Sequence, residues 1–413
     1  MMRSMFSAIS GLKNHQTFMD VVGNNIANVN TTGFKQSRVT FQDILSQTLR
    51  GASGPQGGRG GVNPSQVGLG VLISGVDTVQ SQGTLQSTGK LTDMAIQGDG
   101  YFVMSDGKQQ LYSRDGAFDL GIDGTLVNPA SGLHVLGWQA DPITGVIDTT
   151  VPAANISVPV GAGMTGKGST TLDLKGNLDS TTADLGTASV SSTVYDAHGN
   201  AIPLTITFTK AAAPAVNTWG VAITTSSTDV TTLNNTGGPN ITFNGTGQVA
   251  TGGTGGITLT MGNGADPVNV AIDFNQLTQL ASASDMSSNT DGASAGSLTT
   301  FTVGAAGDIT GIYSNGYKQP LGQIALASFS NPSGLMKAGG NLFTASPNSG
   351  TASIGIPDSA GRGQIATGFL EGSNVDLAQQ FTNMIMAERG FQANSRVITT
   401  SDEILQDLVN IKH

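Results

Sequence analysis

The sequence predicts a mainly β protein with a terminal α-helical coiled coil: two β domains are inserted between paired N- and C-terminal helices, so the domains are discontinuous and nested. Both ends carry apolar residues at heptad spacing, which is typical of paired helices. The middle carries alternating apolar residues punctuated by Asp-Gly pairs, which is typical of antiparallel hairpins. Gly accounts for 58 of 413 residues and charged residues for 11%, against about 25% in an average domain.

The N-terminal pattern predicts a helix over residues 3–29. A row of positions spaced alternately by three and four residues is apolar at six of its eight members: Met2, Met5, Ile9, Leu12, Gln16, Met19, Gly23 and Ile26. At 1.5 Å per residue this helix is about 40 Å long. Asn, Thr and Gly then crowd residues 24–33, where a helix is hard to continue.

The C-terminal pattern predicts a second helix over residues 374–411, about 57 Å long. Ser373 and Asp376 form a Ser-x-x-Asp start signal, in which Ser373 accepts from an early backbone N–H. Gly390 weakens the helix by roughly 1 kcal/mol relative to Ala. One apolar row recurs every seven residues: Leu377, Met384, Phe391, Ile398 and Leu405. An interleaved row is broken by polar residues: Phe381, Glu388, Ser395, Asp402 and Val409.

Neither helix is self-sufficient, because each has an apolar stripe that needs a cover. The economical solution is that the two helices cover each other. The polar breaks favour further contacts with neighbouring copies, although a simple intramolecular pair is the plainer alternative. The predicted polymer interface is Met5, Ile9, Leu12, Met19, Ile26, Leu377, Phe381, Met384, Phe391, Ile398 and Leu405.

The middle of the chain reads as strands and turns. Hairpin turns are expected at Asp106-Gly107, Asp115-Gly116 and Asp123-Gly124, and at Asp196–Gly199 with Asn200. Residues 51–66, which are rich in Gly, are expected to form a flexible linker or a loop ordered only by neighbours.

The composition argues against several functions. A net charge of −10, with 18 scattered Lys and Arg, disfavours a nucleic-acid partner. There is no Cys, and His15, His134, His198 and His413 have no metal-ligand spacing. No run of apolar residues is long enough to span a membrane.

Three short motifs imitate binding loops. "GAGMTGKGST", residues 161–170, has Gly168 where a phosphate loop needs Ser or Thr. "GTGQVA", residues 245–250, opens no helix, and "DLGIDG", residues 119–124, lacks calcium ligands. We therefore expect no cofactor, no metal and no catalytic residues.

Five motifs together closely resemble the axial proteins of the bacterial flagellum, the rod and hook family. They are "NNIANVNTTGFK", "FQDIL", "AIQGDGYFV", "YSRDGAFDLGIDGTLVN" and "EGSNVDLAQQFTNMIMAERGFQANSRVITTSDEILQDLVNI". The match covers about residues 1–150 and 300–413. The insertion at 151–297, with "VYDAHGN", and the later "LGQIALASFSNPSGL" are similar to hook proteins within that family.

The resemblance implies four parts: an inner coiled coil (1–30 and 374–413), a connecting region (31–72 and 365–373), a middle β domain (73–150 and 298–364) and an outer β domain (151–297). It also implies a structural function: subunits stack into a hollow, flexible tube that passes motor torque to the filament and lets exported subunits through. Asn24, Asn25, Asn28, Gly33 and Phe34 belong to the family motif where the inner helix ends, and Gly33 permits a positive φ.

The resemblance also implies partners and a route. Expected partners are further copies, the distal rod protein, the hook cap and the hook-filament junction proteins. Family members leave the cell unfolded through the flagellar type III export gate, without a cleaved signal peptide, so an extracellular hook location follows. Phe41 and Leu45 of "FQDIL" occupy the export-recognition positions. The alternatives are a distal rod subunit, which the length disfavours, a secreted β-rich adhesin and, third, an enzyme.

Overall fold

The computed structural model describes residues 2–55, 60–142, 144–161, 163–164, 166–235 and 240–410. The tip of the 51–66 segment, two positions of the 161–170 motif and His413 lie outside the described residues. The chain divides into two compact units. Unit 1 comprises Met1–Val158, Thr302–Thr310 and Pro320–His413, and unit 2 comprises Pro159–Phe301 and Gly311–Gln319. The finer four-part organisation stays a prediction.

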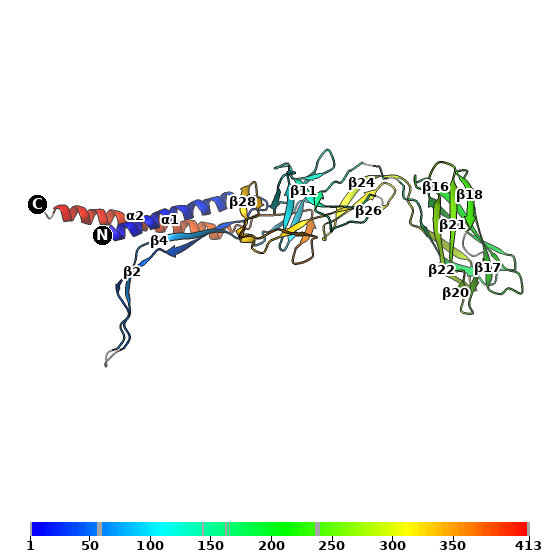
Figure 1. The fold of residues 1–413 in the computed structure, drawn as a ribbon, viewed down its shortest axis with the longest axis horizontal. Coiled ribbons are helices and arrows are strands. Elements are labelled where there is room, and N and C mark those ends of the chain that lie inside the picture. The colour runs from blue at the N-terminus through cyan, green and yellow to red at the C-terminus, as the bar shows by residue number, and fades with distance from the viewer. Residues whose placement is uncertain are drawn as a thin grey trace. The chain divides into compact units, whose positions relative to one another are not determined.

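Two long helices carry the ends of unit 1. Helix α1 spans Met2–Ala27 and helix α2 spans Leu377–Asn410. Figure 1 shows them side by side, with both chain termini at the same end, so they pack antiparallel. The expectation of two terminal helices that pack together is therefore confirmed.

The start of α2 corrects one expectation, because the cap is Asp376 rather than Ser373. The Asp376 carboxylate accepts from the backbone N–H of Gln379 at 3.2 Å, which is the usual N-cap bond to the third helical residue. Ser373 accepts only from Val375 at 3.3 Å, in the extended segment before the helix.

Two antiparallel strand pairs follow α1. Strand β1 (Ser37–Asp43) pairs with β4 (Val71–Thr78), and β2 (Ser46–Arg50) pairs with β3 (Ser65–Gly68). The expected flexible linker is thus largely the continuation of a hairpin. Reciprocal backbone bonds between Ser53 and Val62, at 3.0 and 2.9 Å, extend the ladder beyond β3.

The β part of unit 1 is built on one continuous path of paired strands, β26-β11-β7-β8-β29-β28. These strands are β26 (Lys318–Ile324), β11 (His134–Gln139), β7 (Tyr101–Ser105), β8 (Gln110–Ser113), β29 (Leu342–Thr344) and β28 (Met336–Gly339). Strands β9 (Asp119–Leu120), β10 (Leu126–Val127), β12 (Ala154–Asn155), β27 (Leu326–Ser328) and β30 (Ser353–Gly355) join the same sheet. Two separate pairs, β31 (Gln364–Thr367) with β6 (Met94–Gln97) and β32 (Phe369–Glu371) with β5 (Leu85–Ser87), lead toward α2.

Aromatic residues fill the core on one face of this sheet. The ring of Phe329 meets Tyr112 edge-on at 4.8 Å and Tyr101 at 5.8 Å. Such edge-to-face contacts add to the area that aromatic side chains bury.

Two of the three hairpin turns predicted at Asp-Gly pairs are confirmed. Asp106-Gly107 joins β7 to β8 and Asp123-Gly124 joins β9 to β10, as predicted. Asp115-Gly116 is not a hairpin turn, and that prediction is wrong. Gly116 is needed there because Met94 approaches its backbone too closely for any Cβ.

Unit 2 contains two five-stranded sheets, ordered β18-β21-β22-β14-β23 and β15-β16-β17-β19-β20. The first consists of β18 (Val230–Asn235), β21 (Thr254–Met261), β22 (Val268–Leu280), β14 (Thr171–Asp179) and β23 (Asp285–Thr290). The second consists of β15 (Thr187–Tyr195), β16 (Ala201–Lys210), β17 (Thr218–Thr225), β19 (Asn240–Phe243) and β20 (Val249–Thr251). The chain also forms β13 (Gly163–Met164), β24 (Gly296–Val303) and β25 (Asp308–Tyr313) near the boundary of the units.

The two sheets of unit 2 share one core. On β16 the side chains alternate, with Ile206 and Phe208 buried and the intervening Thr exposed, which is the period expected of a half-buried strand. Phe274 of β22 meets Phe208 edge-on at 6.2 Å, and Trp219 is fully buried. The Asp196–Gly199 turn joins β15 to β16, as predicted.

Candidate assembly interface

The contact between α1 and α2 is built from small and polar side chains. A Cβ on Gly11 would lie 2.7 Å from the Asn394 amide nitrogen, and one on Gly390 would lie 2.5 Å from the His15 ring. At the far end of the pair, Asn25 donates to Gln380 at 3.2 Å. Glycine therefore lets the two helices approach closely at two places.

This inner face differs from the apolar row predicted on α1. The fully buried residues of α1 are Ala8, Gly11, Asn14, Val22 and Asn25. Of the predicted row, Ile9 is 49% exposed, and Met5, Leu12, Met19 and Ile26 are half-buried. The predicted row lies beside the helix contact and keeps apolar surface available.

On α2, half of the predicted pattern faces α1. Met384, Phe391, Ile398 and Leu405 are half-buried and alternate with Gln380, Ala387, Asn394 and Ser401 on the inner face. The predicted interleaved row lies one residue further on and points outward, so Phe381 is 52% exposed and Glu388 and Asp402 are exposed. Leu377 is also 40% exposed. Of the residues on this inner face, Ala387 and Ser401 are small, and both are buried.

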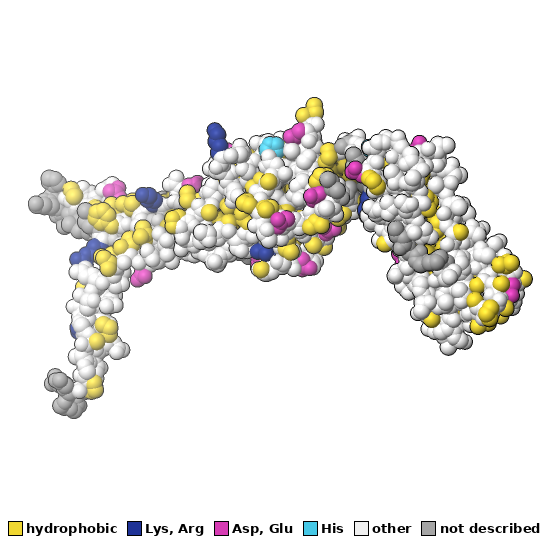
Figure 2. Space-filling view, turned by 45° about the vertical axis from the view of Figure 1, so that its right-hand side comes forward, with side chains coloured by type: hydrophobic (Ala, Val, Ile, Leu, Met, Phe, Trp, Pro, Cys, Tyr) yellow, Lys and Arg dark blue, Asp and Glu magenta, His cyan; other side chains and the backbone are white. Residues whose placement is uncertain are grey.

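The helix pair therefore leaves a large set of apolar side chains uncovered. We call it the uncovered helical surface, and it comprises Phe6, Ile9, Leu377, Phe381, Ile385, Met386, Val397, Ile404 and Val409. Figure 2 shows yellow hydrophobic side chains on the helical part of the molecule. Exposed apolar sets of this size mark sites of protein association.

The Asn-rich turn after α1 is held by side-chain hydrogen bonds. The buried Asn25 amide donates to the Ser37 carbonyl at 2.8 Å, and its oxygen accepts from the Ser37 N–H at 2.9 Å. Asn28 donates to the carbonyl of Asn24 at 2.9 Å. Asn24 itself is exposed. These bonds end the helix and fix the direction of β1.

Gly33 has a φ of +66° in this turn. Its N–H donates to the Glu371 carbonyl at 2.8 Å, and a Cβ would lie 2.6 Å from the backbone nitrogen of Asp115. Glycine is therefore required here for both conformation and space. The next residue, Phe34, is buried beneath the Lys337 ammonium, which lies 5.1 Å from its ring.

A buried charged junction lies behind the turn. Lys35 donates to the Glu371 carboxylate at 2.6 Å, and the Arg114 guanidinium lies 3.4 Å from its other oxygen. All three side chains are at most 3% exposed. Burial lowers the pKa of Lys35 from its usual 10.5, against the attraction of Glu371. Two cations thus share one buried carboxylate.

This junction connects three distant parts of unit 1. Lys35 comes from the turn after α1, Arg114 follows β8, and Glu371 ends β32 just before α2. The Glu371 carboxylate also accepts from the backbone N–H of Gly83 at 2.8 Å. The sequence analysis missed these residues. They were detectable as the rare charges inside the motifs that carry the resemblance.

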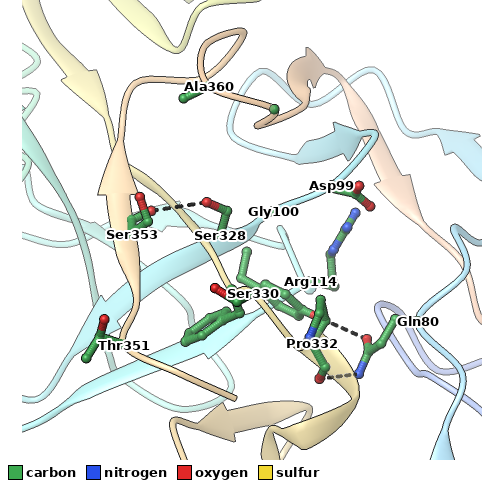
Figure 3. A pocket seen from close by; sticks show the side chains of 13 residues that line it. Gln80, Asp99, Gly100, Arg114, Ser328, Ser330, Pro332, Thr351, Ser353 and Ala360 are labelled. Carbon is green, nitrogen blue, oxygen red and sulfur yellow. Dashed lines mark hydrogen bonds between the residues drawn. The ribbon is translucent and has the colours of Figure 1, made fainter. Parts of the chain in front are cut away.

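A cavity of about 360 Å³ lies beside Arg114. In Figure 3 the Arg114 side chain extends toward Asp99, and Gln80 accepts from the Tyr101 hydroxyl at 2.8 Å. Burial raises the pKa of Tyr101 to about 12. The lining contains no His, and no nucleophile is paired with a base there.

The two predicted export-recognition residues lie outside this junction. Phe41 on β1 is 42% exposed and meets Phe18 of α1 edge-on at 5.7 Å. Leu45, between β1 and β2, is 68% exposed. Folding therefore leaves Leu45 largely accessible and covers more than half of Phe41.

The described residues hold no group of three or more His, Asp or Glu side chains suited to a metal ion. Within the same residues, neither helix is apolar enough over a sufficient length to cross a bilayer.

Four protein-family profiles match the chain. They are described as flagella basal body rod protein (residues 5–35), flagellar hook protein FlgE/F/G D1 domain (95–177), flagellar basal body protein FlaE D2 domain (164–293) and flagellar basal body rod FlgEFG protein C-terminal (366–411). Together they cover both helices and parts of both units.

Full-length relatives give the same family. The chain is 41% identical to the flagellar hook protein FlgE of Borreliella burgdorferi and 40% identical to that of Treponema pallidum, in each case over all of both chains. It is also 33% identical, again over all of both chains, to a Bacillus subtilis protein named flagellar basal-body rod protein FlgG.

A solved structure shows the same fold. The flagellar hook protein FlgE2 of Helicobacter pylori matches with a TM-score of 0.53 and 16% identity, over 69% of this chain and all of that one. The Borreliella and Treponema hook proteins have higher identities to the chain than the Bacillus rod protein has, and the hook family is one of structural proteins rather than enzymes. The chain therefore belongs to the flagellar hook protein family and is a structural subunit of the bacterial flagellar hook.

Proposed function

We propose that copies of this chain polymerise through the uncovered helical surface into a hollow helical tube. The tube is a flexible joint that passes motor torque to the filament and lets exported subunits through. The observation that carries the proposal is the uncovered helical surface. Unlike the apolar residues of a finished coiled coil, each of these side chains keeps between 40% and 66% of its surface exposed among the described residues. A surface that binds a different surface of the next copy yields an open filament instead of a closed ring.

The four predicted parts give this tube a radial order. In the proposal, residues 1–30 and 374–413 line the channel, and residues 31–72 and 365–373 connect outward. The middle β domain (73–150 and 298–364) and the outer β domain (151–297) follow. The charged junction supports this order, because it fixes the direction in which the chain leaves both helices.

Removing residues 1–30 and 374–413 tests the proposed polymer. We expect the shortened chain to form no tubes in electron micrographs and to restore no swimming in cells that lack the hook subunit. A far-ultraviolet circular dichroism spectrum that keeps its β signal shows that folding survives. Tubes formed by the shortened chain would refute the proposal.

Flexibility is the second part of the proposal. Within its described residues, unit 2 forms one ion pair, between Lys167 and Asp291 at 3.4 Å. Subunit contacts with few fixed charge pairs slide more easily when a tube bends. Adding charge pairs to the surface of unit 2 is expected to stiffen isolated hooks in bending measurements. Unchanged stiffness would refute this part.

Export through the flagellar type III gate is the third part, with Phe41 and Leu45 as the recognised residues. The proposed location is the extracellular hook, between the distal rod protein and the hook-filament junction proteins, with the hook cap at the growing end. Phe41→Ala with Leu45→Ala is expected to leave the chain inside the cell. Leu49→Ala is the matched control, because Leu49 is 61% exposed on the neighbouring strand. Normal export of the double variant would refute the assignment.

A further inference from the structure

A second exposed feature of unit 1 lies away from the helices. Ile122 forms the tip of the turn between β9 and β10, and its side chain is as exposed as in an isolated peptide, at 110%. The exposed Asp123 follows it, with one carboxylate oxygen accepting from the Thr125 hydroxyl at 2.7 Å. We call Ile122 and Asp123 the acidic knob. An apolar side chain at the tip of a rigid turn gains stability if another surface covers it.

A pocket of about 310 Å³ lies elsewhere on unit 1, between the C-terminal end of α1 and the turn that joins β28 to β29. We call it the socket. Its apolar lining comes from Phe34, Leu342 and Phe343, and its polar rim includes Asn24 and Lys337. A pocket with an apolar floor and a few polar groups is the usual form of a recognition site.

The β28–β29 turn shapes the mouth of the socket. Gly339, Gly340 and Asn341 all have positive φ, at +90°, +57° and +59°. Asn341 donates to the Thr32 carbonyl at 2.8 Å, which ties the turn to the segment after α1. Gly and Asn tolerate positive φ, so the turn adopts this shape at little cost, and the bond from Asn341 holds it in place.

Two polar groups on the rim, those of Lys337 and Asn24, form no bond to a carboxylate or to a side-chain amide among the described residues. The Lys337 ammonium donates to the Lys35 carbonyl at 3.2 Å and to the Ser37 hydroxyl at 3.1 Å, and it forms no ion pair within the described residues. The side chain of Asn24 has no hydrogen-bond partner among the same residues. The socket therefore offers one cation and one amide to an incoming group.

We propose that the socket of one copy receives the acidic knob of a neighbouring copy. Ile122 fills the apolar floor, Asp123 pairs with Lys337, and Asn24 hydrogen-bonds the backbone of the knob. Charge and polarity match on both sides. The knob and the socket are different surfaces of one chain, as an open helical assembly requires. The inference rests on the proposed polymerisation and adds a second, specific contact to it.

Disulfide trapping tests this contact cleanly, because the chain has no Cys. The variant with Asn24→Cys and Ile122→Cys is assembled under reducing conditions and then oxidised. We expect a ladder of covalent multimers in denaturing gels, and no ladder from either single variant. Asn24→Cys with Val146→Cys is the control, since Val146 is also on an exposed turn of unit 1 and is 65% exposed. A polymer that gives no ladder would overturn the inference while leaving the proposed polymerisation intact.

Reversing the two charges tests the same contact independently if the Cys variant does not assemble. Asp123→Lys and Lys337→Glu are each expected to raise the critical concentration for polymerisation by about tenfold, which corresponds to roughly 1.4 kcal/mol. The double variant is expected to recover most of that loss, because the pair is restored with opposite sign. Two single losses without recovery, or no effect of either change, would overturn the inference.

Discussion

Glu371 is the residue on which the junction between the helices and the β part depends. It neutralises two buried cations, Lys35 and Arg114, so the three partners are not equivalent. Loss of one cation leaves a neutral pair. Loss of the anion leaves two like charges in a medium where each is costly to bury.

This asymmetry gives a prediction. Glu371→Gln is expected to lower the free energy of unfolding of unit 1 by about 3–5 kcal/mol. Lys35→Met loses the hydrogen bonds to Glu371 and to the Ser81 carbonyl, but Arg114 and the Gly83 N–H still hold the carboxylate, so this change is expected to cost less, about 2 kcal/mol. Urea denaturation of the monomer measures both. Equal losses would contradict the account of two cations on one carboxylate.

Asp291 makes the stability of unit 2 depend on pH in the acid range. Burial of its carboxyl opposes ionisation, but hydrogen bonds from the Thr170 hydroxyl and from the backbone of Thr171 and Thr170 outweigh it and lower the pKa to about 2. The nearby Lys167 contributes in the same direction.

A carboxyl whose pKa is depressed on folding stabilises the fold above its unfolded pKa and loses that effect as pH falls through the folded pKa. The stability of unit 2 is therefore expected to fall by about 2 kcal/mol between about pH 4 and pH 2. Asp291→Asn should start lower and show a flatter profile over this interval. Fluorescence of Trp219, which is buried in unit 2, monitors the unfolding. An unaltered profile in the variant would contradict this role.

At the scale of the element, glycine decides how closely α1 and α2 approach. Gly11 and Gly390 sit where a Cβ would collide with Asn394 and His15. Gly23 on the same helix α1 has open space around it. Glycine normally weakens a helix relative to Ala, so the three positions separate helix propensity from packing.

We predict opposite effects of the same substitution. Gly23→Ala is expected to stabilise the chain by about 0.5–1 kcal/mol. Gly11→Ala and Gly390→Ala gain the same propensity but force the helices apart, so each is expected to destabilise by about 1–3 kcal/mol. The amplitude and midpoint of the helical circular dichroism signal on heating report both. Stabilisation by all three changes would show that the helix contact is looser than described.

These glycines also show what the sequence could and could not predict. Heptad spacing indicated two helices and the pairing between them, because periodicity depends on local geometry. It assigned the large residues Phe381 and Ile9 to apolar rows without separating the face between the helices from the outer face, and the inner face uses Gly11, Ala8 and Ala387. Small residues carry a weak hydrophobic signal, so the face that packs most closely was the face that the pattern missed.

Contacts between residues that are far apart in the sequence could not be predicted. The Asp106-Gly107 turn was predictable because a hairpin turn is a local motif. Asp115-Gly116 is the same dipeptide, but Gly is needed there because the backbone of Met94, which belongs to β6, lies against it. Lys35 and Glu371 are 336 residues apart in sequence, so no spacing rule connects them. Only the fold brings such residues together.

At the scale of the whole molecule, the chain combines well-buried β cores with a helix pair whose outer surface is still apolar. Trp219 and Phe102 are fully buried in their units, whereas Phe381 and Ile385 are more than half exposed. The β cores are complete in one copy. In the proposed polymer, the outer surface of the helices becomes buried when further copies pack against it.

The last prediction tests that division. Changing Phe381, Ile385 and Val397 together to Ser removes three members of the uncovered helical surface and none of the inner face. The thermal midpoint of the monomer is expected to stay nearly constant. Each side chain is about half exposed, so its cover in the polymer is worth about 1 kcal/mol, and the critical concentration for tube formation should rise roughly 100-fold.

A matched control variant shows whether an effect on assembly comes from lost apolar contact or from any substitution on the outer face of α2. Glu388→Gln with Asp402→Asn alters two exposed polar residues of α2 and removes no apolar surface. Its critical concentration is expected to stay within about threefold of the original, because exposed charges contribute little. Sedimentation of the polymer across a concentration series compares the three chains. If the Ser variant assembled as readily as the original, contacts between the β units would have to hold the tube together. The uncovered helical surface would then not be the polymer interface.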